Sequence, residues 1–94
     1  RLALLVSPDG RDGSIAAHQD ALLFGARLDA GRSLDYRIGA DRRGWIQIAR
    51  GRVLIAGQEL SAGDGAGIAA GTDLVIEALA DQAEQAELLL FDLP

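Results

Sequence analysis

The chain has 94 residues and a formal net charge of −5, from 14 acidic and nine basic side chains. Its length suits one small domain over residues 1–94, and no apolar run approaches the roughly 18 residues that a membrane-spanning helix needs. Without cysteine, the chain has no disulfide, thiol nucleophile or cysteine-based metal site. This composition suits a reducing compartment, so we expect a cytoplasmic location. The negative charge and the few aromatic residues argue against nucleic-acid binding.

Short apolar segments, separated by turn residues, make up the first part of the chain. We expect strands at residues 2–6, 14–18, 21–30 and 33–38. In the last of these, Leu34, Tyr36 and Ile38 alternate with polar residues, as in a strand with one buried face. Gly25 interrupts the third strand, where a bulge or a close backbone approach is the usual cause.

The middle of the chain predicts a series of β-hairpins. Ile46 and Ile48 fall on one face of a strand, and Trp45 and Gln47 fall on the other. Gly51 follows, and we expect it to join two paired strands. Further turns are expected at Gly57–Gln58 and at Gly63-Asp64-Gly65.

The last third of the chain predicts strands at residues 66–70, 74–79 and 86–93. Residues 80–85 have the highest local helix propensity, but we expect a loop there because an apolar strand pattern resumes directly afterwards. About nine short antiparallel strands without helical crossovers favour an all-β sandwich or barrel and exclude a parallel α/β fold.

Several motifs resemble those of one protein family. They are S-P-D-G-R-D-G-S at 7–14, H-Q-D at 18–20, W-x-Q-x-x-x-G at 45–51, G-Q-x-L-x-x-G-D-G at 57–65 and L-L-F-D-L-P at 89–94. With them the chain resembles the C-terminal cupin domain of the pirin-like two-cupin proteins, often described as quercetin 2,3-dioxygenases. The resemblance implies a small cupin-type barrel (a jelly roll, or double-stranded β-helix). It also implies an N-terminal cupin domain that holds the family metal, usually iron, on three His and one Glu.

The general cupin metal motif places two His, a Glu and a further His inside the barrel. Anchored on Gly31 and Gly51, the motif puts these positions on Arg37, Gly39, Gly44 and Ala66. None of them is a metal ligand. His18 is the only histidine, and a single imidazole defines no metal site. We therefore predict no metal, no cofactor and no catalytic residue in this chain.

The motif and the apolar pattern disagree about which residues face inward. The motif points Arg37 and Gly39 into the barrel, whereas the alternation points Tyr36 and Ile38 inward. A shift of one residue exchanges the two faces of a strand. We follow the apolar alternation.

Trp45 and Gln47 are the candidate interface residues. If Ile46 and Ile48 fill the barrel, Trp45 faces outward, where tryptophan often marks an interface. The expected partner is the N-terminal cupin domain or a second copy of this chain. Alternatively, a loop of the same domain, such as residues 7–13, covers the indole.

Arg37, Arg42 and Arg43, which flank the loop before Trp45, are candidate residues for binding an anionic ligand, because arginine pairs well with carboxylates. The alternative is that they are solvated and pair with neighbouring aspartates. Glu77 is the candidate for acid–base chemistry, with an exposed position on a solvent-facing strand as the alternative.

Three functions follow from these observations. The leading hypothesis is a non-metal, structural domain that supports the metal-bearing N-terminal cupin. The alternative is a small-molecule-binding barrel without turnover. A metal-dependent dioxygenase in its own right would need ligands from another chain, so enzyme activity depends on the complete protein.

Overall fold

The computed structural model describes residues 2–7, 15–16 and 20–94, and every regular element in this part of the chain is a β-strand. The strands are β1 (Leu2–Ser7), β2 (Ile15–Ala16), β3 (Leu22–Leu28), β4 (Ser33–Arg37), β5 (Arg43–Arg50), β6 (Arg52–Ile55), β7 (Gln58–Ser61), β8 (Gly65–Ile68), β9 (Asp73–Ala78) and β10 (Ala86–Leu93). The expected all-β fold is confirmed. Within the described ranges no helix is long and apolar enough to cross a membrane.

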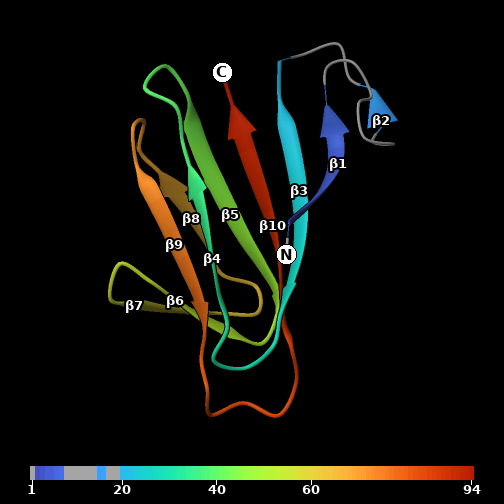
Figure 1. Cartoon of the computed structure of the whole chain (residues 1–94), viewed down its shortest axis with the longest axis vertical. Helices are drawn as coiled ribbons and strands as arrows, with labels where there is room; N and C mark the ends of the chain where they lie inside the picture. Colours follow the sequence, from blue (N-terminus) through green and yellow to red (C-terminus); the bar gives the residue numbers. More distant parts are fainter. Residues whose placement is uncertain (1, 8–14, 17–19) are drawn as a thin grey trace.

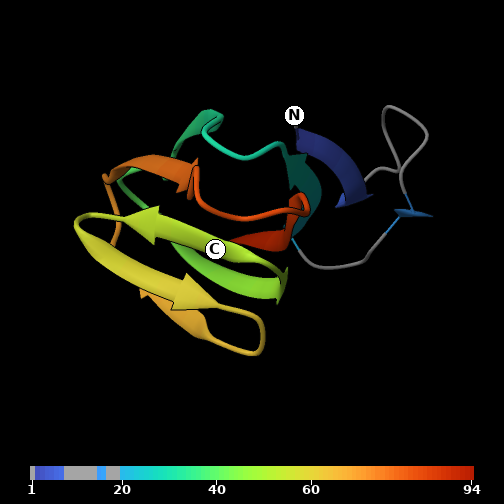
Figure 2. The same ribbon diagram turned by 90° about the horizontal axis from the view of Figure 1, so that it is seen from below.

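The strands form two sheets that face each other around a common interior (Figures 1 and 2). One sheet has six strands in the order β2-β1-β3-β10-β5-β8, and the other has four in the order β4-β9-β6-β7. The pairings are antiparallel, as expected, except that β1 and β2 pair in parallel over two residues.

Alternating side chains from both sheets make the core. Ile46 and Ile48 of β5 and Leu90 of β10 are buried against Val53 of β6 and Ile76 of β9. The inward face predicted for Ile46 and Ile48 is therefore confirmed. Aliphatic side chains dominate this cluster.

The expected hairpin at Gly51 is wrong. β5 pairs with β10 and β8 in the six-stranded sheet, whereas β6 pairs with β7 and β9 in the four-stranded sheet. Gly51 is a corner at which the chain passes from one sheet to the other. Period-2 alternation continues across the corner, because both strands bury one face in the same core, so the sequence pattern does not separate a corner from a hairpin.

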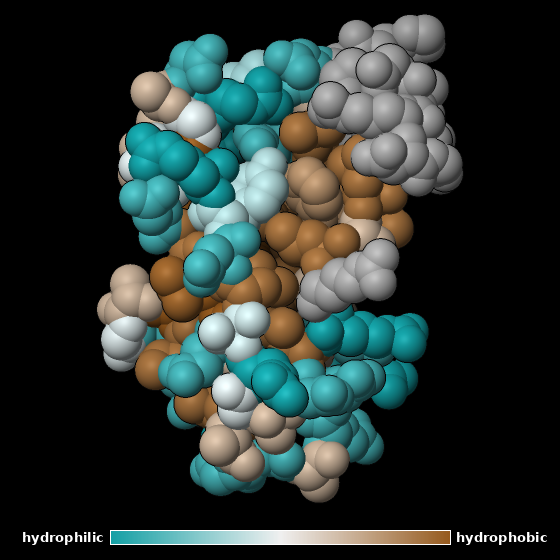
Figure 3. Space-filling view, viewed as in Figure 1, coloured by the Kyte–Doolittle hydropathy of each residue, from teal (hydrophilic) through white to brown (hydrophobic). Residues whose placement is uncertain are grey.

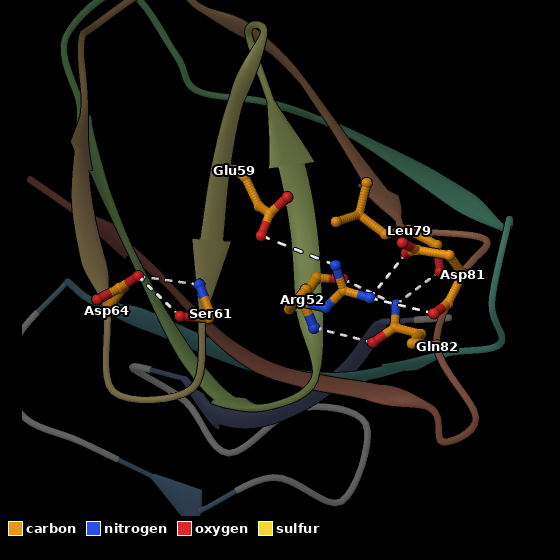
Figure 4. Close-up of polar contacts among 7 residues, drawn as sticks. All are labelled: Arg52, Glu59, Ser61, Asp64, Leu79, Asp81 and Gln82. Atoms are coloured by element: carbon orange, nitrogen blue, oxygen red, sulfur yellow. Dashed lines mark hydrogen bonds and ion pairs between the residues drawn. The ribbon is translucent and has the colours of Figure 1, made fainter.

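Gln82, in the loop before β10, holds the corner in place (Figure 4). Its side-chain oxygen accepts a hydrogen bond of 2.9 Å from the backbone N–H of Arg52, and its Nε2 donates to the carbonyl oxygens of Arg52 and Leu79 at 2.9 and 2.8 Å. Gly51 has a φ of +74°, and a Cβ placed there would lie 2.9 Å from Ala86 Cα. Glycine is therefore required both by the backbone conformation and by the close approach of β10.

The other turns agree with the sequence apart from small shifts. The β6–β7 hairpin turns at Ala56 and Gly57, both with positive φ as two-residue hairpins favour, one residue earlier than expected. Residues 80–85 form turns and bends without a helix. The irregularity expected at Gly25 of β3 lies in the neighbouring strand, because β1 has a bulge at Leu5. A Cβ at Gly25 would lie 3.2 Å from Leu5 Cδ1, so the close approach is made by a side chain rather than by a backbone.

The register of β4 follows the apolar alternation. Leu34 pairs with Ile76 and Tyr36 with Leu74 of β9, and Ile38 after the strand is fully buried. Arg37 points away from the core, with 59% of its side chain exposed. The register taken from the metal motif is therefore not the one adopted.

Replacing Gly51 by alanine tests the corner, with Gly71→Ala as the matched control. Gly71 has nearly the same φ, +75°, but a Cβ added there would have no atom within 4 Å. We expect Gly71→Ala to lower the free energy of unfolding by about 1–2 kcal/mol through φ strain alone. Gly51→Ala should lower it by a further ~1–3 kcal/mol, because the methyl group meets the backbone of β10. Urea denaturation measures both, and equal losses would contradict the steric role of Ala86.

Candidate interaction face and buried polar cluster

The outer face of the six-stranded sheet, which points away from the four-stranded sheet, carries large apolar side chains on its central strand β10. Along β10, Ala86, Leu88 and Leu90 face the core, whereas Leu89 and Phe91 face outward. Leu93, further along the strand, also faces outward. The strand is therefore apolar on both faces, as strands covered on both sides are.

The register aligns the outer side chains in rows across the sheet. Phe91 lies between Leu23 of β3 and Trp45 of β5, and in the next row Leu89 lies between Gly25 and Gln47. Leu5 of β1 covers Gly25. Leu5 and Trp45 are 40% and 42% exposed, so a large apolar area faces out of the domain.

Trp45 and Gln47 are fixed by their own domain. The indole N–H donates to the side-chain oxygen of Gln47 at 3.3 Å, and Gln47 Nε2 donates to the carbonyl oxygens of Gly63 and Asp64 at 3.2 and 3.1 Å. A Cβ at Gly65 of β8 would overlap the indole ring, which therefore lies against the glycine backbone of this edge strand. The alternative cover, the loop that follows β1, lies outside the described residues.

A second apolar surface lies where the two sheets separate. In the view of Figure 1, hydrophobic residues gather across the middle of the molecule between β3 and β4, and hydrophilic residues predominate at its upper left and in its lower part (Figure 3). Phe24 of β3 and Tyr36 of β4 meet at this surface, with ring centroids 5.2 Å apart, and both pack against the core. These rings close the interior from this side.

A buried polar cluster lies next to Tyr36. Asp92 of β10 is 4% exposed, and its two carboxylate oxygens accept hydrogen bonds from the Tyr36 hydroxyl and from Arg42 Nε, both at 2.5 Å. Arg42 also donates to the Asp92 carbonyl at 3.0 Å and to the side chain and carbonyl of Asp20 at 3.0 and 2.8 Å. The cluster ties together β4, the β4–β5 loop, β10 and the segment before β3.

The hydrogen bond with Asp92 is the main reason that the pKa of Arg42 is raised; partial burial opposes the rise and Asp20 adds to it. A raised pKa stabilises the fold at every pH below the ordinary arginine value, and this contribution is lost only as pH rises through the folded-state value. The guanidinium therefore stays charged at physiological pH. With every carboxylate oxygen of Asp92 occupied, the cluster has the chemistry of a structural link.

The candidate ligand-binding arginines are not brought together, and Arg42 belongs to the buried polar cluster with Asp92. Arg37 lies on the outer face of the four-stranded sheet and pairs with Asp73 at 2.8 Å, whereas Arg43 lies on the outer face of the six-stranded sheet. Glu77 is exposed on β9. His18 lies outside the described residues.

Apart from Asp92, the inward positions described at the end of the barrel near Tyr36 hold apolar residues or glycine. Ile38, Gly44 and Ile68 meet there: a Cβ on Gly44 would lie 2.8 Å from Ile38 Cδ1 and 3.2 Å from Ile68 Cβ. Over residues 2–7, 15–16 and 20–94, no three His, Cys, Asp or Glu side chains come together as metal ligands would. The donor set in this part of the chain does not fit the metal of the family.

Neither the polar cluster nor the apolar outer face was predicted from the sequence. Both leave a signal in A-E-L-L-L-F-D-L at residues 86–93. Asp92 lies on the same face of the strand as the inward Leu88 and Leu90, so its carboxylate is expected to be buried. Leu89 and Phe91 lie on the opposite face, which is therefore apolar as well.

Arg42→Met tests the cluster, and Arg37→Met is the matched control. Removing Arg42 leaves the buried Asp92 carboxylate without its cation, which we expect to lower the free energy of unfolding by about 2–4 kcal/mol, somewhat less than for a fully enclosed pair because 18% of the Arg42 side chain is exposed. Arg37 pairs with Asp73 in solvent, so its loss should change stability by at most about 1 kcal/mol. Urea denaturation at pH 7 compares them, and equal small effects would contradict a structural role for the cluster.

Comparisons with known proteins agree with this geometry. A family model described as "Quercetinase C-terminal cupin domain" matches residues 4–93. The "Quercetin 2,3-dioxygenase" of Escherichia coli strain K12 is 42% identical over 91 residues, which are 97% of this chain and 38% of that protein.

Solved structures show the same relation. The crystal structure of YhhW from Escherichia coli has a TM-score of 0.90 and 40% identity, covering 99% of this chain and 38% of that one. The structure described as bacterial pirin YhhW in complex with nickel(II) has a TM-score of 0.90 and 39% identity, covering 100% of this chain and 39% of that one. The chain thus spans less than two-fifths of the length of these relatives, and it belongs to the C-terminal cupin domains of the pirin-like, quercetinase-type proteins.

Proposed function

We propose that residues 1–94 are a single, non-metal, non-catalytic cupin domain that supports a preceding metal-bearing cupin in a longer protein. In such a protein the preceding domain carries the reaction, and this domain contributes rigidity and an interface. Trp45 and Gln47 belong to that interface. The absence of cysteine from the chain supports a cytoplasmic location for the complete protein.

The filled interior is the observation that carries the proposal. Ile38, Gly44 and Ile68 occupy the end of the barrel at which inward ligands would be needed, and they offer no donor atom. The inward carboxylate at this end, that of Asp92, is already bound by Tyr36 and Arg42. Replacing such a close-packed apolar set by imidazoles and a carboxylate would require several simultaneous substitutions. Such an apolar set contributes packing and has no ligand atom to offer a metal ion.

The relatives supply the second line of support. The matched part is about two-fifths of each of them, and the description of the family model places it at the C-terminal side. One of these structures is described as a complex with nickel(II). The proposal assigns the metal of such a protein to its preceding domain, on the three His and one Glu that the family resemblance implies. Quercetin 2,3-dioxygenase activity is then proposed for the complete protein.

A small-molecule-binding barrel remains the second candidate. The apolar surface between β3 and β4 favours it, because Phe24 and Tyr36 are suitable for stacking on an aromatic ligand. The same rings pack against a core whose aliphatic side chains occupy the space between the sheets. We rank this function second because a ligand would have to displace them.

Metal content tests the proposal directly. We expect the 94-residue chain, produced in medium supplemented with iron and nickel, to carry less than about a tenth of an equivalent of either metal by mass spectrometry, because a transition-metal site needs several converging ligands. A longer chain that includes the preceding domain is the control and should carry close to one equivalent.

Near-stoichiometric iron, nickel or copper on the 94-residue chain would overturn the proposal. If both chains carry little metal, the proposal of a non-metal C-terminal domain stands. The proposal of a metal-bearing preceding domain is then contradicted.

A further inference from the structure

The two sheets differ in what they present outward. On β9, Leu74 and Ile76 are buried, and the outward residues are Asp73, Val75 and Glu77. This pattern is typical of a sheet with one solvated face. β10 buries its inward residues equally well but places leucine and phenylalanine outward. The outer face of the six-stranded sheet therefore has the composition of a covered surface.

The outer face is hollowed where its side chains are small. Ala3, Gly25 and Ala49 leave space beside Leu5 and Leu89. A concave apolar floor can receive a side chain from a partner, and central, desolvated contacts of this kind provide most of the binding energy of an interface. Trp45 lies at the other end of the face, where its indole already packs on β8.

A charged row borders the hollow. Glu87 of β10 forms ion pairs with Arg27 of β3 at 2.9 Å and with Arg50 of β5 at 3.5 Å. The arginine side chains are 73% and 69% exposed, whereas that of Glu87 is 28% exposed. An apolar centre with a polar margin is the usual layout of a protein–protein interface.

We infer that the preceding domain of the longer protein packs against the outer face of the six-stranded sheet, with the contact centred on Leu89 and Leu5. The inference rests on the proposed function and makes it specific: the centre of the contact is the β1–β3–β10 hollow, and Trp45 and Gln47 form its margin. The partner surface is apolar opposite Leu89 and polar opposite Arg27 and Arg50.

The position of β1 is the reason for choosing this occupant. Three-fifths of each relative lies outside the matched part, and the family description places that remainder before it. A preceding domain joins this one through β1, and β1 itself contributes Ala3 and Leu5 to the hollow. The connection thus delivers the preceding domain to the apolar face at high effective concentration. The polar outer face of the four-stranded sheet offers no comparable surface.

Cysteine labelling tests the inference in the longer protein that carries the preceding domain. Leu5→Cys reports on the hollow, and Val75→Cys on the outer face of the other sheet is the matched control, since these side chains are 40% and 53% exposed in the domain itself. If neither position were covered, the two variants would react with a maleimide at similar rates. We expect Leu5→Cys to react at least about tenfold more slowly. Labelling requires the interface to open, so a tenfold lower rate means that the interface is open about one-tenth of the time.

Two controls keep the result interpretable. In urea both variants should react at the same rate, and each must retain a cooperative unfolding transition without urea. If Leu5→Cys does not fold, Leu89→Cys replaces it, because Leu89 lies in the same hollow. Background cysteines of the preceding domain are replaced by serine beforehand.

Protection of position 5 that does not change on dilution supports the inference. Equal labelling at positions 5 and 75 overturns it. Protection that disappears on dilution also overturns it, because the cover is then a second copy of the chain. Either negative outcome leaves the metal measurement unaffected, so a failure of the docking surface is distinguishable from a failure of the proposed function.

Discussion

The fold depends on the central position of β10. This strand is hydrogen-bonded along its length to β3 on one side and to β5 on the other, so it joins the N-terminal strands to the middle of the chain. Its inward side chains enter the core, its outward side chains build the apolar face, and Asp92 anchors the polar cluster. A substitution in β10 therefore affects pairing, packing and the surface together.

Ile38 and Asp92 show how one end of the barrel is stabilised by its own side chains. In a metal-binding barrel, polar ligands pointing inward are stabilised by the ion they hold. Here Ile38 fills the space by van der Waals contact, and the inward carboxylate is stabilised by an arginine and a tyrosine that come from neighbouring strands and loops. Close packing and a hydrogen-bonded ion pair therefore both stabilise this end of the barrel.

Much of the fold was predictable, and the reasons for success and failure are local. The inward faces of β4 and β5 follow from period-2 alternation, because each strand has one face in a single core. The passage at Gly51 was not predictable, because alternation is the same for a hairpin and for a change of sheet. The partners of Asp92 could not be predicted either, because Asp20, Tyr36 and Arg42 are far from it in the sequence and come close only through the order of the strands.

The strand order also constrains when the domain can become structured. β10 consists of residues 86–93 and occupies the middle of a sheet whose neighbouring strands are made much earlier in the chain. During synthesis β3 and β5 therefore lack their shared neighbour until residues 86–93 have left the ribosome, and until then their apolar faces are not covered by β10. Folding must then close contacts between distant parts of the sequence, which is slow for β-sheet topologies and exposes the nascent chain to aggregation. A domain that has already folded earlier on the same chain would give these uncovered apolar faces a surface to pack against.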